Sequence, residues 1–221
     1  AARVLIVGLG GLGSPVALYL AAAGVGTLVL ADGDTVEPSN LQRQVAHGEA
    51  DIGVNKARSA AASVAALNPG VAVEVVERTL AAPDLPRLLT GVDLVVDASD
   101  NYPVRFALNR ACIAAAVPLV SAAAVRAEGQ VSLFDPVRGG PCYRCLYDET
   151  GDSSALSCGE SGVLAPLVGV VGSLQAMEAV KVMAGYGEPL RGRLLLLDLA
   201  HGELRTFSLA RRAGCPDCGH L

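Results

Sequence analysis

Four of the cysteines in this sequence form two close pairs. Cys142 and Cys145 are one CxxC pair, Cys215 and Cys218 are the other, and 69 residues (146–214) separate them. Each pair can present two thiolates to one side of a tetrahedral ion, so both together complete a closed site with no open position for chemistry. The spacing predicts a structural zinc site that ties the C-terminal tail to the body of the protein. Two redox dithiols are the alternative, but neither pair opens a helix in a thioredoxin-like pattern.

Two further cysteines lie outside these pairs. Cys112 lies between Ala111 and Ile113 in a helical pattern, so we expect a small buried side chain. Cys158 lies in the polar, glycine-containing stretch 151–159, which permits access to the thiol. A reactive catalytic thiol is one interpretation of Cys158, and an inert loop thiol is the other.

A glycine-rich loop is suited to binding phosphates. Gly8, Gly10, Gly11 and Gly13 follow an apolar run and precede a helix-like stretch. Glycines let the backbone approach phosphates, and a helix N-terminus supplies N–H groups and a favourable dipole. Asp32 ends the next apolar run, where a carboxylate can accept hydrogen bonds from ribose hydroxyls. The pattern predicts a nucleotide site, and a tight turn without ligand is the alternative.

Charged side chains in three further places suit ATP better than a dinucleotide. Arg43 lies in a loop-like stretch, Lys56 opens a predicted helix and Asp100 follows a predicted strand. When an anion attacks a triphosphate, the negative charge of both must be neutralised. We therefore expect Arg43 and Lys56 to face the phosphates and Asp100 to hold Mg²⁺ through oxygen. The structural alternatives are a surface ion pair for Arg43, a solvated first-turn residue for Lys56 and a helix N-cap for Asp100.

Alternating strand-like and helix-like runs must position these groups. The predicted strands are Val4–Val7, Thr27–Leu30, Val71–Val76, Val92–Val96 and Pro118–Ser121, and the predicted helices are Ser14–Ala23, Val54–Leu67 and Pro103–Ala116. This alternation predicts a doubly wound parallel sheet, whose strands end at one edge and bring the loop, Asp32 and Asp100 together there.

The last third of the chain has a different pattern. Strands are predicted at Gln130–Phe134, Arg193–Asp198 and Leu204–Phe207, with a long helix at Val163–Ala184. We expect these strands to extend the sheet in antiparallel fashion. The predicted fold class is therefore α/β, a Rossmann-like mixed sheet that is mostly parallel and flanked by helices. Because no linker or repeat interrupts the pattern, residues 1–221 are predicted to form a single domain.

Composition narrows the classes of function. The 221 residues are 52% hydrophobic and 18% charged, with a mean hydropathy of +0.44, which excludes intrinsic disorder. A net charge of −5 argues against a nucleic-acid partner. The long apolar stretch contains Ser173 and Gln175, so a buried helix is expected rather than a membrane span. With no signal-peptide pattern, the expected compartment is the cytoplasm, and the missing initiator Met suggests a piece of a longer protein.

Taken in order, the motifs resemble the ThiF/MoeB adenylyltransferases, which are E1-like enzymes. The resemblance runs along essentially the whole chain and is closest to the molybdopterin-synthase adenylyltransferase branch. Its motifs are RVLIVGLGGLG from Arg3, D-x-D-T-V from Asp32, S-N-L-Q-R-Q from Ser39, N-x-K at Lys56, S-D-N at Ser99, PCYRC from Pro141, the loop cysteine Cys158, G-V-x-G-S-L-Q-A-M-E-A from Gly169 and GCPDC from Gly214.

The resemblance implies a reaction. Family members bind Mg-ATP and adenylate the C-terminal Gly-Gly carboxylate of a small ubiquitin-fold sulfur carrier, releasing pyrophosphate before a thiocarboxylate is formed. By position it implies that the ATP site contains Gly8, Gly10, Gly11, Gly13, Asp32, Ser39, Asn40, Leu41, Gln42, Arg43, Lys56, Asp100 and Asn101. It implies catalytic roles for Arg43, Lys56, Asp100 and Cys158, although Cys158 forms a covalent link to the carrier in some relatives and is dispensable in others.

The resemblance also implies partners. Family members are homodimers, in which Arg43 reaches into the neighbouring subunit's site. A segment before Ala1 is expected to help complete the nucleotide site. The sulfur must come from a separate donor, such as a cysteine desulfurase or a rhodanese. The sequence leaves open whether the carrier serves molybdopterin, thiamine, tRNA thiolation or cysteine synthesis.

Other functions compete for the same glycine loop. A nicotinamide-dependent oxidoreductase would need a hydride-transfer acid, and none of His47, His201 and His220 lies in a convincing place. A non-catalytic binding protein with this fold would be expected to lack Arg43, Lys56 or Asp100, and all three are present. A tRNA threonylcarbamoyladenosine dehydratase shares the ATP loop, but the acidic balance and the two CxxC pairs argue against it.

Overall fold

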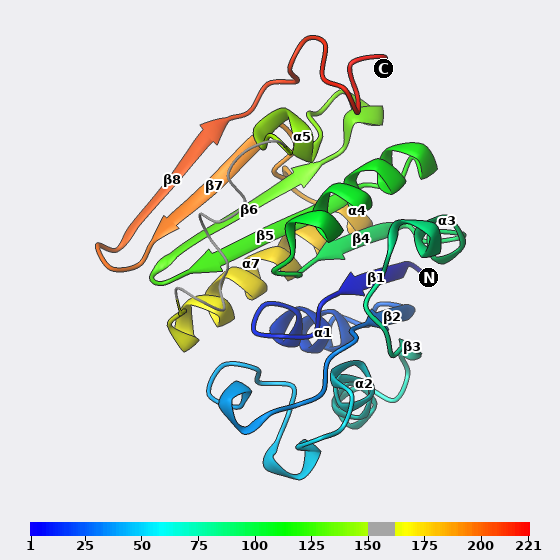
Figure 1. Cartoon of the computed structure of the whole chain (residues 1–221), viewed down its shortest axis with the longest axis vertical. Coiled ribbons are helices and arrows are strands. Elements are labelled where there is room, and N and C mark those ends of the chain that lie inside the picture. The colour runs from blue at the N-terminus through cyan, green and yellow to red at the C-terminus, as the bar shows by residue number, and fades with distance from the viewer. Residues whose placement is uncertain (150–161) are drawn as a thin grey trace.

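A mixed sheet of eight strands organises the computed structural model, which describes residues 1–149 and 162–221. The strands are β1 (Arg3–Val7), β2 (Thr27–Ala31), β3 (Ala72–Val76), β4 (Leu94–Asp97), β5 (Leu119–Val125), β6 (Glu128–Phe134), β7 (Arg193–Asp198) and β8 (Glu203–Ser208). Their order is β3-β2-β1-β4-β5-β6-β7-β8. The first five pair in parallel, and β6, β7 and β8 are added antiparallel (Figure 1). The predicted fold class is confirmed.

Helices cover both faces of the sheet. They are α1 (Gly13–Ala22), α2 (Lys56–Leu67), α3 (Leu85–Leu88), α4 (Tyr102–Ala115), α5 (Tyr143–Leu146) and α7 (Ala165–Ala184). One core lies between the sheet and α1, α2 and α7, and another lies between the sheet and α3, α4 and α5. Figure 1 shows α4 in front of the strands and α7 behind them.

The central strands are apolar throughout because they contribute to both cores. In β1, Val4 and Ile6 belong to the core with α1 and α7, whereas Leu5 and Val7 belong to the core with α3 and α4. Successive side chains of a strand point to opposite faces. A parallel strand covered on both sides therefore has a continuous apolar run, as the sequence of β1 does.

Helix α7 has the length and apolar composition of a membrane span. However, it packs along α1, β5 and β6, and two of its polar side chains are buried against the protein backbone. Gln175 Nε2 donates to the carbonyl oxygens of Asp97 at 2.6 Å and Val120 at 3.2 Å. Glu178 Oε2 accepts from the Leu190 N–H at 2.7 Å. Buried polar groups need such partners, so these bonds fit the prediction of a core helix.

Most predicted boundaries lie within two residues of the observed ones. Helix α2 begins at Lys56 rather than at Val54, because the Asn55 side chain caps it by accepting from the N–H groups of Ala57 and Arg58 at 2.9 and 3.3 Å. The largest difference is in β5, which runs on to Val125.

The added residues of β5 include three alanines, which favour strands weakly. They are extended because this part of β5 pairs with β6 from Ala122↔Val131 to Val125↔Glu128. The one-turn helices α3 and α5 were not predicted, since four residues carry too little periodicity.

Candidate functional site

The loop between β1 and α1, residues 8–13, depends on its glycines to different degrees. Gly8 has a φ of +88°, and a Cβ there would lie 2.8 Å from the carbonyl oxygen of Ala98. A Cβ at Gly13 would lie 1.8 Å from the carbonyl oxygen of Gly8. At Gly10 a Cβ would meet only side-chain atoms, the nearest at 3.5 Å. The backbone therefore requires glycine at 8 and 13, whereas a Cβ at position 10 would make only an ordinary contact with the Gln44 side chain.

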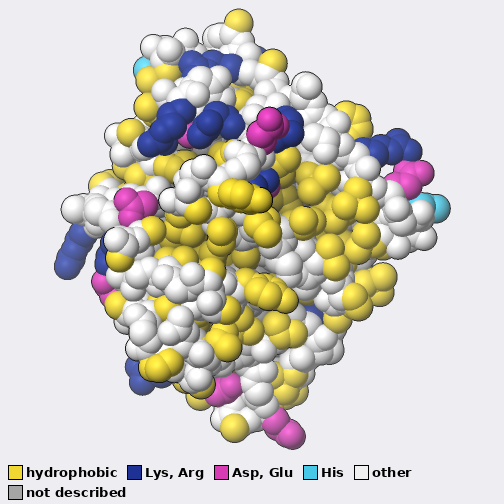
Figure 2. Space-filling view, turned by 180° about the vertical axis from the view of Figure 1, so that it is seen from behind, with side chains coloured by type: hydrophobic (Ala, Val, Ile, Leu, Met, Phe, Trp, Pro, Cys, Tyr) yellow, Lys and Arg dark blue, Asp and Glu magenta, His cyan; other side chains and the backbone are white. Residues whose placement is uncertain are grey.

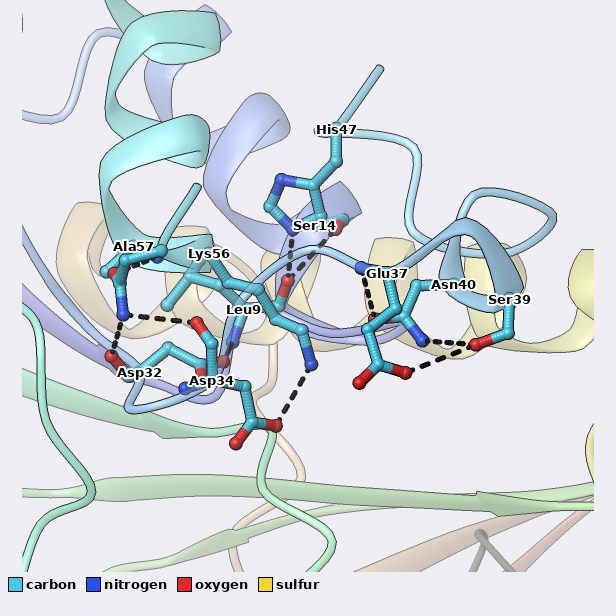
Figure 3. A network of polar contacts seen from close by, with 11 residues as sticks. Leu9, Ser14, Asp32, Asp34, Glu37, Ser39, Asn40, His47, Lys56 and Ala57 are labelled. Carbon is cyan, nitrogen blue, oxygen red and sulfur yellow. Dashed lines mark hydrogen bonds and ion pairs between the residues drawn. The ribbon is translucent and has the colours of Figure 1, made fainter. Parts of the chain in front are cut away.

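Asp32 and Lys56 hold the next part of the site together (Figure 3). The Asp32 carboxylate accepts from the N–H groups of Leu9 at 2.7 Å and Asp34 at 2.8 Å. Burial raises the pKa of Asp32 above its ordinary value, and the two N–H donors oppose that rise. Lys56 is buried, with its Nζ 3.0 Å from the Asp34 carboxylate. The alternative that Lys56 is a solvated surface residue is thereby excluded.

The segment after Asp34 brings an amide and a guanidinium to the loop. It contains a short helical turn, Pro38–Asn40, whose Asn40 is buried. The Asn40 Nδ2 donates to Ser39 Oγ at 3.3 Å, and Arg43 donates to the Ser39 carbonyl oxygen at 3.0 Å. Within the described part of the chain, Arg43 has no carboxylate partner, so its charge is not consumed by an ion pair.

A buried network supports the loop that follows β4. Asp97 accepts from Ser99 Oγ at 2.6 Å and Ser121 Oγ at 2.8 Å, and lies 3.5 Å from the guanidinium of buried Arg105. Arg105 also donates to the carbonyl oxygens of Ser99 and, at 2.8 Å, Ala122. The ionic and hydrogen-bonding partners fix the backbone that carries Asp100.

The Asp100 side chain itself is not used by the fold. Asn101, not Asp100, caps α4, because its Oδ1 accepts from the Val104 N–H at 3.2 Å. Asp100 is exposed, and no residue in 1–149 or 162–221 donates to its carboxylate. The helix-cap alternative for Asp100 is wrong, and a hard oxygen ligand remains available to a cation such as Mg²⁺.

These segments enclose a cavity of about 700 Å³ at the carboxyl ends of the parallel strands, which we call the phosphate-loop cavity. Its volume is that of a small-molecule site. The predicted nucleotide residues that line it are Gly8, Gly10, Gly11, Asp32, Asn40, Arg43, Lys56, Asp100 and Asn101. The remaining four, Gly13, Ser39, Leu41 and Gln42, belong to the same segments without lining the cavity.

Unpaired polar groups around this cavity fit a nucleotide. Among the described residues, none accepts a hydrogen bond from the backbone N–H of Gly10, Gly11 or Leu12. These N–H groups lie at the N-terminus of α1, where phosphate oxygens bind readily. Gln44 Oε1 is buried without a partner and its residue also lines the cavity, so a ligand N–H or O–H can satisfy it. The donor set and the volume together suit a nucleoside triphosphate.

A second cavity of about 520 Å³, which we call the sheet groove, lies over β5 to β8. It shares Asp100, Arg105, Ala123 and Ala124 with the phosphate-loop cavity. At its far end it reaches the half-exposed Phe207 of β8. Because the same residues line both spaces, the two cavities meet at Asp100.

The two CxxC pairs come together as the sequence predicts. The Sγ atoms of Cys142 and Cys215 are 3.6 Å apart, those of Cys145 and Cys218 are 3.5 Å apart, and all four lie within 4.8 Å of one another. Four thiolates bound to tetrahedral Zn²⁺ at ~2.3 Å would be about 3.8 Å apart. The cluster therefore fits a zinc ion with little movement.

The four-cysteine cluster is tied to α4 through Asp217, which lies between Cys215 and Cys218. Asp217 accepts from Asn109 Nδ2 at 2.8 Å and pairs with Arg144 at 3.0 Å. Asn109 Oδ1 in turn accepts from the Tyr143 N–H at 2.8 Å. Tyr143 also lines the sheet groove, so the cluster supports one wall of it.

The other two cysteines, Cys112 and Cys158, lie outside the four-cysteine cluster. Cys112 is buried in the core, and burial raises the pKa of its thiol, which keeps it protonated as an inert hydrophobic residue. Cys158 lies outside the described residues, and its predicted reactivity stays a prediction.

Several residues that line the site were not among those predicted from the sequence. Arg78 and Thr79 line the phosphate-loop cavity just after β3, so the rule that identified Asp32 after β2 could have found them. Gln44 adjoins Arg43 and lines the same wall. Arg105 carried no signal, because a charged residue in a helix is usually at the surface and its burial depends on the tertiary fold.

Comparison with known proteins decides the family. Residues 1–217 match the model of the ThiF family. The chain belongs to the ThiF family. It is 51% identical to the molybdopterin-synthase adenylyltransferase of Escherichia coli (strain K12) over 98% of this chain and 87% of that protein. It is 47% identical to the SAMP-activating enzyme E1 of Haloferax volcanii over 98% of this chain and 80% of that protein. The expected family and the adenylyltransferase class are confirmed.

Solved structures agree with the fold of this ThiF-family protein. A crystal structure of E. coli MccB with ATP superposes with a TM-score of 0.87 and 27% identity, covering 99% of this chain and 66% of that one. A structure of E. coli MccB with MccA-N7isoASN gives the same TM-score at 25% identity, covering 99% of this chain and 67% of that one. The similarity covers both the parallel and the antiparallel strands.

Proposed function

We propose that this protein uses Mg-ATP to adenylate the C-terminal carboxylate of a ubiquitin-like sulfur-carrier protein that ends in Gly-Gly. One observation carries the proposal: a cavity suited to a triphosphate and a groove suited to a peptide tail meet at Asp100. An enzyme that joins a nucleotide to a chain end needs both spaces to converge on one point. The named functions of the relatives agree with this reaction.

The chemistry needs alignment and neutralisation of charge more than proton transfer. The carrier's carboxylate is already ionised at neutral pH, so its oxygen attacks the α-phosphorus without a general base. A bond forms between that oxygen and the α-phosphorus, the α–β phosphoanhydride bond breaks, and pyrophosphate leaves with the electron pair. Holding the two reactants in line and stabilising the developing charge supplies most of the acceleration.

Three charged side chains suit these tasks. Lys56 and Arg43 line the phosphate-loop cavity and counter the charge of the phosphates, while the N–H groups of Gly10 and Gly11 hold phosphate oxygens. Asp100 offers a carboxylate to Mg²⁺, which would neutralise the leaving pyrophosphate. Asp32 lies at the end of β2, where it can accept hydrogen bonds from the ribose hydroxyls.

The sheet groove suits a thin, extended tail. Ala123 and Ala124 line the place where it opens into the phosphate-loop cavity, and their small side chains leave room for a backbone. A Gly-Gly terminus is the narrowest peptide end that can enter. At the outer end of the groove, Phe207 of β8 is about half exposed and can contact the body of the carrier.

A structural zinc ion and a sulfur donor complete the proposal. Cys142, Cys145, Cys215 and Cys218 bind structural Zn²⁺, for which the mutual distances of their sulfur atoms are suitable. No open coordination position is left, so the ion does not take part in the adenylation. Conversion of the acyl-adenylate to a thiocarboxylate then depends on a sulfur donor such as a cysteine desulfurase or rhodanese.

The protein acts as a homodimer in this proposal. Val170 and Met177 of α7 are exposed, as are Leu164 at its N-cap and Tyr19 of the neighbouring helix α1. Figure 2 shows hydrophobic side chains spread over this face of the molecule. Exposed apolar patches commonly mark protein–protein contacts, and a second copy is the occupant proposed here. Met177→Glu is expected to shift sedimentation from dimer to monomer, whereas an unchanged dimer would place the interface elsewhere.

Exchange of labelled pyrophosphate into ATP tests the adenylation. With a Gly-Gly carrier, ATP and Mg²⁺ present, the reversible reaction should incorporate label into ATP. Omission of the carrier, or deletion of its final glycine, should stop the exchange. Binding of ATP with no exchange on any carrier would contradict the proposed acceptor, and absence of ATP binding would contradict the nucleotide site.

A further inference from the structure

His47 is buried at a junction of three segments, and the proposed reaction gives it no role so far. It is 8% exposed. Its Nε2 lies 2.8 Å from the carbonyl oxygen of Leu9 in the glycine loop, and its Nδ1 lies 2.8 Å from Ser59 Oγ on α2. Figure 3 shows the ring beside Leu9 and Ser14, on the far side of the loop from Asp34. The loop, the segment of Arg43 and the helix of Lys56 therefore meet at this one side chain.

The partners of His47 determine its tautomer. A carbonyl oxygen can only accept, so Nε2 must carry the proton that it donates to Leu9. Nδ1 is then the acceptor for the Ser59 hydroxyl. His47 is held as the neutral Nε2–H form with both nitrogens engaged, which leaves neither free to transfer a proton to a ligand.

The bond to the Leu9 carbonyl fixes the direction of the next N–H group. In a trans peptide unit the C=O of Leu9 and the N–H of Gly10 point in opposite directions. His47 and Ser14 Oγ, the latter at 3.3 Å, both donate to this carbonyl from one side. Asp32 accepts from the Leu9 N–H at 2.7 Å. The peptide unit between Leu9 and Gly10 is therefore held through its carbonyl oxygen, and the unit before it, between Gly8 and Leu9, is held through its N–H.

We propose that His47 is a positioning residue, which orients the Leu9–Gly10 peptide so that the Gly10 N–H is preset to bind a phosphate oxygen of ATP. The inference rests on the nucleotide-binding function proposed above. His47 does not touch the nucleotide. Without it, the glycine-rich loop can rotate this peptide, and part of the binding energy of ATP must then be spent on ordering it.

The electrostatic surroundings keep the ring neutral. Burial lowers the pKa of His47 below its ordinary value, with a smaller contribution in the same direction from Lys56. The Leu9 carbonyl and the carboxylates of Asp51 and Asp32 oppose this change without reversing it. The neutral tautomer is therefore the form present at neutral pH.

The test compares two variants of His47 with a buried control. His47→Leu removes both hydrogen bonds, whereas His47→Gln keeps a side-chain N–H that can reach the Leu9 carbonyl. We expect His47→Leu to raise the Kd and KM for Mg-ATP about tenfold with little change in the KM for the carrier, and His47→Gln to recover most of the affinity. Ser132→Ala, a buried change that removes a 2.8 Å bond to the Arg193 carbonyl on another strand, should lower stability without changing the Kd for ATP.

Nitrogen NMR of labelled histidine provides a second readout. In the unsubstituted protein it should show a protonated Nε2 and an unprotonated Nδ1 at His47. An Nδ1–H tautomer, or a His47→Leu variant that binds Mg-ATP with unchanged affinity, would overturn the inference. Failure of the unsubstituted protein to bind Mg-ATP would instead overturn the nucleotide site itself, and this inference with it.

Discussion

The two halves of the sheet are stabilised in different ways. In the parallel half, β4 is wholly buried and β1 and β2 are buried at four of their five positions. In the antiparallel half, every residue of β8 is exposed, and β7 has a single buried residue. In the antiparallel half, burial decreases from β6, which packs on α7, to the edge strand β8, and the segment beyond β8 carries two cysteines of the cluster.

This difference separates the two tasks of the site. The phosphate-loop cavity is built from the ends of buried strands, where backbone N–H groups are held rigidly. The sheet groove runs from β5 outward to the exposed strand β8, and one of its walls, Tyr143, belongs to the segment that carries Cys142 and Cys145. ATP binding should therefore withstand changes in the antiparallel half, and carrier binding should not.

Asp100→Ala should have the largest effect on activity. It removes the proposed Mg²⁺ ligand at the meeting point of the two halves, where its carboxylate has no described protein partner. We expect adenylation to fall by about 10²–10³-fold, with the midpoint of thermal unfolding unchanged. Glu77→Gln, which removes an exposed ion pair to Arg58, is the matched control and should retain activity. Substantial AMP transfer by Asp100→Ala would exclude the assigned role.

Loss of the zinc ion should affect the antiparallel half of the sheet and leave the parallel half unchanged. Cys218→Ser is expected to abolish stoichiometric zinc, measured by atomic emission, and to destabilise the antiparallel half by several kcal/mol. The amides of β7, β8 and the C-terminal tail should exchange with solvent faster, while those of β1 and β2 stay protected.

In the same Cys218→Ser variant the KM for the carrier should rise and the Kd for ATP should stay the same. The reason is that loss of the metal would displace Tyr143. This residue lines the sheet groove but not the phosphate-loop cavity. Equal losses of ATP and carrier binding would show that the halves are not separable.

Two glycine substitutions in the parallel half distinguish a structural role from a role in ATP binding. A Cβ at Gly13 would lie 1.8 Å from the Gly8 carbonyl oxygen, so Gly13→Ala should lower the free energy of unfolding by about 1–3 kcal/mol or more. Gly10→Ala, whose Cβ has room, should leave stability nearly unchanged and weaken ATP binding. Chemical denaturation and ATP titration of both variants distinguish the two roles, and similar stability losses would argue against them.

The strands of both halves were predictable from the sequence, and the largest error lies at the end of β5, where the two halves join. Apolar runs bounded by glycines located β1 and β2, and the rule for strand ends located Asp32 and Asp100. The end of β5 was missed because Ala122–Ala124 have weak strand preference and are extended only by pairing with β6. The four cysteines were found by spacing alone, since metal ligands constrain sequence more strongly than packing does.

Residues whose role depends on burial could not be identified. Arg105 is an ordinary helix residue in the sequence, and its contact with Asp97 exists only after α4 packs on β4 and β5. His47 was assigned no role because no local pattern indicates that Leu9 and Ser59 contact it. Such contacts arise between segments far apart in the chain, which local patterns do not encode.

The pH dependence of stability is the smallest expected effect. The pKa of His47 is lowered on folding from an ordinary value of 6.5, so the native state binds fewer protons there than the unfolded state. The stabilisation is fully present above the unfolded pKa and is lost as pH falls through the folded pKa. Denaturation from pH 7 to 5 should show a steeper loss for the unsubstituted protein than for His47→Gln, and parallel curves would contradict the neutral buried ring.

Mass spectrometry of the carrier tests the central claim most directly. Small ubiquitin-fold proteins ending in Gly-Gly are incubated with the enzyme, ATP and Mg²⁺, and their intact masses are measured. The account predicts a gain of one adenylate that disappears when the final glycine is deleted or when Asp100 is replaced by alanine. An adenylate that persists on a carrier without its terminal glycine, or no adenylate on any carrier despite ATP binding, would contradict a reaction at the junction of the two cavities.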